Sequence, residues 1–157
     1  MEGPVGRITY KGKKMFHPKG KDPVRVTKLG LLAGGSGITP LYSILNSVYL
    51  AREDDMDVKM LYSNKNVDDM LLREELDAIN ADVSAPNVSV THTLTREQGD
   101  VSAPILKGRV SIEMLRQLGF PEPSDETFYM LCGPSPFNAA CKEVLLAAGH
   151  SEERIFG

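Results

Sequence analysis

Short apolar runs alternate along this chain with stretches in which apolar residues recur at helical spacing. The apolar runs fall at residues 29–33, 58–62, 88–94 and 128–132, and their length is typical of buried strands. Between them, apolar positions at i, i+3, i+4 and i+7 mark one face of an amphipathic helix. This pattern predicts four helices and a last edge strand at 154–156. The helices are expected at Pro40 to about Arg52, at Asp68–Asn80, in a short segment capped by Ser111, and at Phe137–Ala148, where Gly149 ends the last helix.

Strands that alternate with helices predict an α/β fold with a parallel sheet and right-handed crossovers. We expect a Rossmann-like sheet of about five strands in the order 3-2-1-4-5, with helices on both faces. The switch point of this order lies between the first and fourth strands, where such sheets bind ligands. This domain takes residues 29–157. Residues 1–28 are rich in Gly, Pro and Lys and lack the apolar content for a domain of their own. They are predicted to be an arm with a short strand at 7–10, a turn at 11–14 and a loop at 19–23.

A glycine turn, Gly34–Gly37, follows the first predicted strand. Thr39 is expected to cap the next helix, and Pro40 to occupy its first position. A strand, a glycine turn and a helix start present backbone N–H groups to an anion such as phosphate. The G-x-G-x-x-P spacing is neither the dinucleotide fingerprint nor a P-loop. The local pattern therefore leaves two interpretations open, a phosphate site and a glycine turn without a ligand.

Composition and charge limit the function classes. The 157 residues suit one domain, and no apolar run reaches the length of a membrane span, so any membrane association would come from a part outside this sequence. Cys132 and Cys141 match neither a redox pair nor zinc-ligand spacing, which favours a reducing, intracellular setting. No metal site is expected, because the three histidines have no partners at ligand spacing.

The net charge of −3 is unevenly distributed. Residues 1–28 hold eight Lys and Arg against two acidic residues, and the remainder is strongly acidic. A basic arm can bind an acidic partner, although a solvated terminus is the favoured interpretation. Nucleic acid is not expected as a partner, because the chain has no Trp and no aromatic residues interleaved with the basic ones.

Two motifs, in this order, resemble those of the NADH-cytochrome b5 reductase family. Gly34–Pro40 resembles the family's G-G-T-G-I-T-P motif, and Cys132–Phe137 resembles its C-G-P-P-P-M motif. Residues 70–76 resemble the family's I-L-L-R-x-E-L helix, and residues 3–16 its linker. The resemblance covers nearly the whole chain and implies the C-terminal nicotinamide-nucleotide domain of this ferredoxin-reductase superfamily group.

The resemblance also implies a missing part. In the family, an FAD-binding barrel precedes the nucleotide domain, and its R-x-Y-T/S flavin motif has no counterpart here. Residues 1–28 would be the linker left at that boundary, and the chain alone would be inactive and would not hold FAD. In the joined protein, NAD(P)H would reduce FAD, which would pass single electrons to cytochrome b5 or a similar haem protein. The expected location is the cytoplasmic face.

The motifs assign roles to individual residues by resemblance. Gly34, Gly35, Ser36 and Gly37 would let the nucleotide approach the backbone, and Thr39 and Pro40 at the helix start would stabilise its pyrophosphate. Cys132 would position the nicotinamide against the flavin, without redox or covalent chemistry by its thiol. From the residues alone, Cys132 also fits a small buried hydrophobic residue at a strand end.

The remaining cofactor contacts are expected from loops that follow strands: Asn64, Gly133, Pro134, Pro136 and Phe137. Two interpretations of Phe137 stay open, since it can stack near the adenosine or serve as the first core residue of its helix.

The residues after the third strand bear on which nucleotide is used. The family reads L-D-R there, and its Asp repels the 2′-phosphate of NADPH. Here Thr95 removes the carboxylate and Arg96 can pair with a phosphate. The stretch also resembles an S-R-E-Q motif of NADPH-using relatives, but residues 99–101 supply no further basic group. We expect NADH binding with weak discrimination against NADPH.

Two alternatives to the cytochrome b5 reductase interpretation remain open. One is the reductase domain of a nitrate-reductase-like multi-domain enzyme. The other is a non-catalytic nucleotide-binding module that retained the fold and lost its flavin partner.

Overall fold

The central element is the strand β4 (Lys28–Gly34), whose residues after Lys28 are all buried. The computed structural model describes residues 8–10, 15–18, 24–51, 56–96 and 105–157. Parallel pairing joins β4 to β5 on one side and to β8 on the other. The whole sheet has the order β7-β6-β5-β4-β8-β9, and its other strands are β5 (Asp57–Asn64), β6 (Val88–Leu94), β7 (Ile105–Lys107), β8 (Thr127–Cys132) and β9 (Ile155–Phe156).

The predicted strand order is confirmed. Read along the chain, β4, β5, β6, β8 and β9 are strands one to five and lie in the order 3-2-1-4-5. The prediction missed β7, which extends the sheet beside β6. This strand has three residues, of which two are apolar, and such a short run gives no periodicity to detect.

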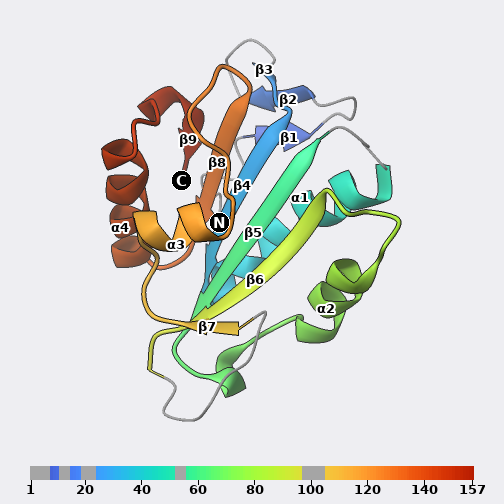
Figure 1. Cartoon of the computed structure of the whole chain (residues 1–157), viewed down its shortest axis with the longest axis vertical. Helices are drawn as coiled ribbons and strands as arrows, with labels where there is room; N and C mark the ends of the chain where they lie inside the picture. Colours follow the sequence, from blue (N-terminus) through green and yellow to red (C-terminus); the bar gives the residue numbers. More distant parts are fainter. Residues whose placement is uncertain (1–7, 11–14, 19–23, 52–55, 97–104) are drawn as a thin grey trace.

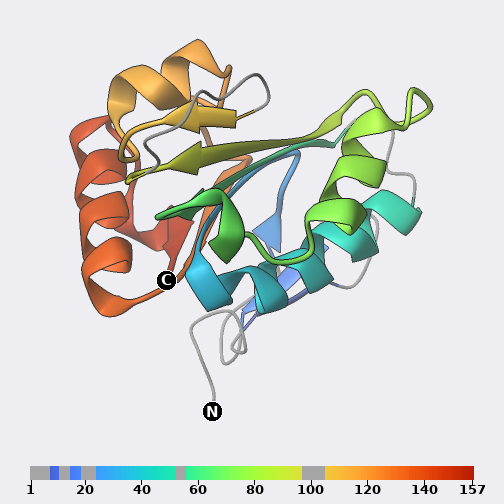
Figure 2. The same cartoon turned by 90° about the horizontal axis from the view of Figure 1, so that it is seen from below.

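Helices cover both faces of the sheet, as expected (Figure 1, Figure 2). Successive strand residues point to opposite faces, so Leu31 packs in one apolar cluster with α1 (Ile38–Ala51) and α2 (Arg73–Ala81). Its neighbour Leu32 packs in the other cluster with α3 (Ile112–Gln117) and α4 (Ser135–Ala147). A parallel strand buried on both faces reads as a continuous apolar run, which is the pattern of β4.

The start of α1 differs from the prediction. A 3-10 turn, η2 (Gly35–Gly37), runs directly into the helix at Ile38, so Thr39 lies inside the first turn and does not cap it. Pro40 is the third residue of α1 and not its first. The glycines permit this continuous turn, and the free N–H groups of the helix start therefore belong to residues from Gly35 onward.

The predicted helix Asp68–Asn80 is divided into two. A 3-10 turn, η3 (Val67–Asp69), comes first, and α2 begins only at Arg73. Leu72 between them has φ +54°, and it is the one non-glycine residue with positive φ in the described part of the chain. It still packs against the apolar cluster, which explains why the spacing of Leu72, Leu76 and Ile79 matched a longer helix.

Two other helix ends agree with the prediction, whereas α4 begins at Ser135, two residues before the expected start at Phe137, because Pro136 is tolerated in the first turn of a helix. The Ser111 side chain accepts a hydrogen bond from the Met114 N–H and caps α3. Gly149, with φ +98°, follows Ala148 at the end of α4 in the C′ position.

The arm forms a small antiparallel sheet of its own: β1 (Ile8–Tyr10), β2 (Met15–Pro18) and β3 (Val24–Arg25). The strand at 8–10 agrees with the prediction, whereas β2 and β3 were not predicted; the turn at 11–14 and the loop at 19–23 lie outside the described residues. Phe16 of β2 is fully buried and belongs to the cluster under α1. A single aromatic anchor has no periodicity, so the sequence pattern did not reveal that the arm packs on the domain.

The burial of Phe16 gives a direct test of this attachment. Phe16→Ala should lower the free energy of unfolding by about 3 to 5 kcal/mol, as truncation of a buried Phe does. Urea unfolding measures this loss, and Val83→Ala, at a position 94% exposed, is the control with little expected change. A loss below about 1 kcal/mol for Phe16→Ala would mean that the arm is a solvated terminus.

Candidate functional site

A cavity of about 810 Å³ lies at the carboxyl ends of the parallel strands. Its lining comes from the carboxyl ends of β4 and β5 and from the residues that follow strands β4 to β8, including residues 34–36, 63–65, 95–96, 109–110, 134, 136 and 137. Parts of the segment 68–71 and of α4 complete the wall. The neighbouring strands β4 and β8 continue into chain segments on opposite faces of the sheet, and this is the switch point that the sequence predicted.

The glycines at the switch point have two different physical roles. A Cβ at Gly37 would lie 2.1 Å from the Cys132 carbonyl oxygen, and a Cβ at Gly34 or Gly133 would collide with the Phe137 ring. These glycines allow two loops and one aromatic ring to pack closely. Gly35 differs, because it has φ +55° and no atom lies within 4 Å of the place of its Cβ. Only Gly35 among them leaves open space toward the cavity.

Asn64 supplies an unpaired polar atom. It ends β5, is 6% exposed and lines the cavity, and its Nδ2 has no hydrogen-bond partner among the described residues. Its backbone carbonyl is occupied, since it accepts a hydrogen bond of 2.9 Å from the Thr95 N–H. A buried amide donor without a partner is costly unless a ligand satisfies it, so this side chain points to a polar ligand in the cavity.

Three cationic side chains line the cavity, and each follows a neighbouring strand. Lys65 comes after β5, Arg96 after β6 and Arg109 after β7. The backbone ties two of these loops together, because the Arg96 N–H donates to the Lys65 carbonyl at 2.9 Å. Asp68 and Asp69 also line the cavity, and Asp69 accepts a hydrogen bond from the Asn66 N–H in a capping box. All three cations are exposed and make no ion pair within the described part of the chain.

Both cysteines are free thiols. Burial raises the pKa of the Cys132 thiol above its usual value, and raises the pKa of Cys141 to about 12. Both groups are therefore protonated at neutral pH and are poor nucleophiles. Cys132 ends β8 directly beside Ala33 of β4, at the start of the glycine turn.

A family model described as "Oxidoreductase NAD-binding domain" matches residues 31–143 of this chain. The match spans β4 to α4 and includes both loops of the switch point. The chain belongs to the oxidoreductase NAD-binding domain family. The resemblance drawn from the sequence motifs is thereby confirmed at the level of the domain.

Relatives of this NAD-binding domain include two kinds of reductase. "NADH-cytochrome b5 reductase 1" of Homo sapiens is 34% identical over 161 residues, which cover 98% of this chain and 51% of the relative. "Nitrate reductase [NADH]" of Solanum lycopersicum is 38% identical over 136 residues, which cover 87% of this chain and 14% of the relative. The chain thus spans about half of the first protein and a small part of the second.

A solved structure agrees with these relatives. The cytochrome b5 reductase domain of Ulva prolifera nitrate reductase superposes with a TM-score of 0.85 at 26% identity, covering 98% of this chain and 58% of that one. Because this match includes nearly the whole chain, it extends the likeness to residues outside the family model.

Most of the predicted site residues meet in the cavity. The residues that line it are Gly34, Gly35, Ser36, Asn64, Thr95, Arg96, Pro134, Pro136 and Phe137. Gly37, Thr39, Pro40, Cys132 and Gly133 do not line it. Gly37 and Gly133 pack within the two loops, and Thr39 and Pro40 are exposed on α1. Phe137 packs against the cluster under α4, as one interpretation expected, and it also lines the cavity, where its contact with an adenosine stays a prediction.

Several lining residues were missed by the sequence reasoning, chiefly Lys65, Arg109, Leu71 and the two carboxylates at 68 and 69. Lys65 directly follows a predicted parallel strand, so examining every residue after such a strand would have found it. Arg109 follows β7 and could not be placed without that strand. Residues 99–101, which were expected to add no basic group, lie outside the described residues.

Within the described residues, no group of three His, Cys, Asp or Glu side chains is arranged to hold a metal ion. None of the described helices is both long and apolar enough to cross a membrane.

Proposed function

We propose that this chain binds a nicotinamide dinucleotide in the cavity and presents it to FAD carried by another part of a longer protein. The observation that carries the proposal is the switch-point cavity with the open Gly35 turn and the unpaired Asn64 amide in its lining. With both cofactors bound, NAD(P)H would supply a hydride to FAD, which would pass electrons singly to a haem protein such as cytochrome b5. This chemistry depends on orientation and distance more than on an acid or base from the protein.

The chain's own residues fit the polar part of such a ligand. The first N–H groups of the continuous turn η2–α1 have no partner within a helix, and they carry the positive end of the helix dipole. They would hold the pyrophosphate beside Gly35 and Ser36. The Asn64 amide would donate to the ligand, and the Phe137 ring would contact its adenosine end.

We further propose that Cys132 positions the nicotinamide, acting by contact and not by chemistry of its thiol. Its place beside the glycine turn and the raised pKa of its thiol support this role. The chain alone, without an FAD-binding domain, is expected to lack reductase activity. Free cysteines support an intracellular location.

The proposal concerns the step that cytochrome b5 reductases and nitrate reductases share, since relatives of both kinds match this chain. The electron acceptor would be set by other parts of the longer protein. If the chain were instead a non-catalytic nucleotide-binding module, the nucleotide titrations would give the same result. No flavin reduction would then be seen once an FAD domain is joined to the chain.

The cavity lining also supports weak discrimination between NADH and NADPH. Thr95 stands where a carboxylate would repel a 2′-phosphate, and Lys65, Arg96 and Arg109 give the adjacent lining three positive charges. Charge-assisted hydrogen bonds from such groups favour a phosphate. Asp68 opposes this effect in part, because it lines the same cavity.

Asn64→Leu tests the proposal. Leu keeps the size of the side chain and removes an unpaired buried donor, so the melting temperature should stay equal to or above that of the parent. The loss of one hydrogen bond to the ligand should weaken NADH binding by about tenfold in a calorimetric titration.

Asn138→Leu is the matched control, because Asn138 also has a buried amide atom without a partner among the described residues but does not line the cavity. The control variant should bind NADH as the parent does. Equal affinity of Asn64→Leu and the parent, or no binding by the parent, would contradict the proposed site.

Thr95→Asp tests the choice of nucleotide. The parent should bind NADPH within about tenfold of NADH, and the added carboxylate should weaken NADPH binding at least about tenfold more than NADH binding, through repulsion of the 2′-phosphate. Side-by-side titrations of both nucleotides measure this. Ser151→Asp adds the same charge outside the cavity lining at a helix cap that Asp can also fill, and should change neither affinity. If the parent already rejects NADPH as strongly as Thr95→Asp does, the argument from Thr95 and the three cations fails.

A further inference from the structure

The hydroxyl of Tyr62 links two separate walls of the cavity. Tyr62 lies on β5 and is fully buried. Its O–H donates to the Gly35 carbonyl at 3.1 Å, and its oxygen accepts a hydrogen bond of 3.1 Å from the Leu71 N–H. Gly35 and Leu71 both line the cavity, whereas Tyr62 does not. One hydroxyl group therefore connects the glycine turn to the segment before α2.

In the glycine turn, the hydrogen bond from the Tyr62 O–H to the Gly35 carbonyl fixes the orientation of a peptide group. The Gly35 carbonyl accepts from Tyr62 and also from the Ile38 N–H. In a trans peptide the C=O and the following N–H point in opposite directions. A carbonyl held toward Tyr62 thus sets the Ser36 N–H on the other side of the same peptide, and Ser36 is an exposed residue of the cavity lining.

In the segment before α2, the hydrogen bond from the Leu71 N–H to the Tyr62 hydroxyl lies next to a strained residue. Leu71 precedes Leu72, whose φ of +54° is unfavourable for a branched side chain. The bend at Leu72 separates η3 from α2 and lets residues 68, 69 and 71 line the cavity. Strain of this kind persists where surrounding contacts hold it, and the Tyr62 hydroxyl supplies such a contact at the adjacent N–H.

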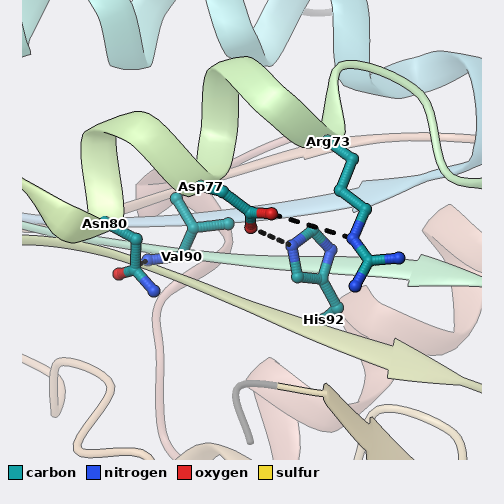
Figure 3. A network of polar contacts seen from close by, with 5 residues as sticks. All are labelled: Arg73, Asp77, Asn80, Val90 and His92. Carbon is teal, nitrogen blue, oxygen red and sulfur yellow. Dashed lines mark hydrogen bonds and ion pairs between the residues drawn. The ribbon is translucent and has the colours of Figure 1, made fainter.

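The helix after this bend is held on the sheet by other contacts (Figure 3). Asp77 of α2 lies 3.9 Å from the Nε2 of the buried His92 on β6, and it also lies 3.7 Å from the Arg73 Nε of its own helix. The Asn80 side chain accepts a hydrogen bond of 3.1 Å from the Val90 N–H, and Leu76 and Ile79 are buried beneath α2. Loss of the Tyr62 hydroxyl should therefore leave α2 in place and affect only the two partners of the hydroxyl, the glycine turn and the segment before α2.

We propose that Tyr62 is a positioning residue for the nucleotide, acting through the Ser36 N–H and through the cavity wall formed by the segment 68–71. This inference rests on the proposed function, because it assumes that the cavity holds a dinucleotide. The ring of Tyr62 fills the cluster under α1 and lies 5.9 Å from the His92 ring, so phenylalanine can replace the packing and removes only the hydroxyl.

Tyr62→Phe in the full 157-residue chain tests the inference, with Tyr129→Phe as a matched control. Tyr129 is also buried and its O–H donates to the Pro121 carbonyl at 2.8 Å, but it packs in the cluster on the other face and does not line the cavity. Both variants lose one buried tyrosine hydroxyl, so both should lose similar thermal stability. Tyr62→Phe alone should weaken NADH binding, by about tenfold in a calorimetric titration.

Hydrogen exchange gives a readout that does not depend on the nucleotide. Without ligand, the Leu71 amide should exchange roughly tenfold faster in Tyr62→Phe than in the parent, and at an unchanged rate in Tyr129→Phe. The inference is overturned if the parent binds NADH and Tyr62→Phe binds it within about twofold, or if Tyr129→Phe loses as much affinity. A parent that binds no nucleotide would instead overturn the proposed function, and the positioning role with it.

Discussion

The site depends on one close approach between two backbones. The turn after β4 and the loop after β8 touch where Gly37 meets the Cys132 carbonyl, at a distance that leaves no room for a Cβ. Phe137 completes this contact by packing against Gly34 and Gly133. Because these two loops are joined, Gly35 and Ser36 are left as the accessible part of the turn that lines the cavity. Close packing thus determines which N–H groups of the helix start can reach a ligand.

The rest of the cavity follows from the topology of the sheet. All its strands are parallel, so their carboxyl ends lie along one edge, and the residues that follow them share one space. This edge collects groups of different character: the unpaired Asn64 amide, the cations at 65, 96 and 109, and the wall that begins at Asp68. A dinucleotide, with a charged pyrophosphate, polar riboses and flat rings, matches such a lining.

Regular periodicity made most of this fold predictable from the sequence. The long strands and α4 have continuous apolar patterns, and the two glycine-containing motifs identified the family and six of the lining residues. Features that depend on single contacts could not be predicted from the sequence. Phe16 anchors the arm without any repeat, Leu72 breaks a helix despite helical spacing, and β7 is too short to show a pattern. The prediction of an N-cap at Thr39 was wrong, because the glycine turn is itself a 3-10 helix that runs directly into α1.

The central claim is that the dinucleotide binds at the carboxyl ends of the strands, between the glycine turn and the loop after β6. A titration of the ¹⁵N-labelled chain with NAD⁺, followed by amide chemical shifts, tests it most directly. We expect the largest shifts at Gly35, Ser36, Asn64 and Thr95, and little change at Ala147 near the end of α4 or at Ile155 of β9. Shifts that gather away from these loops, or no saturable shifts, would contradict it.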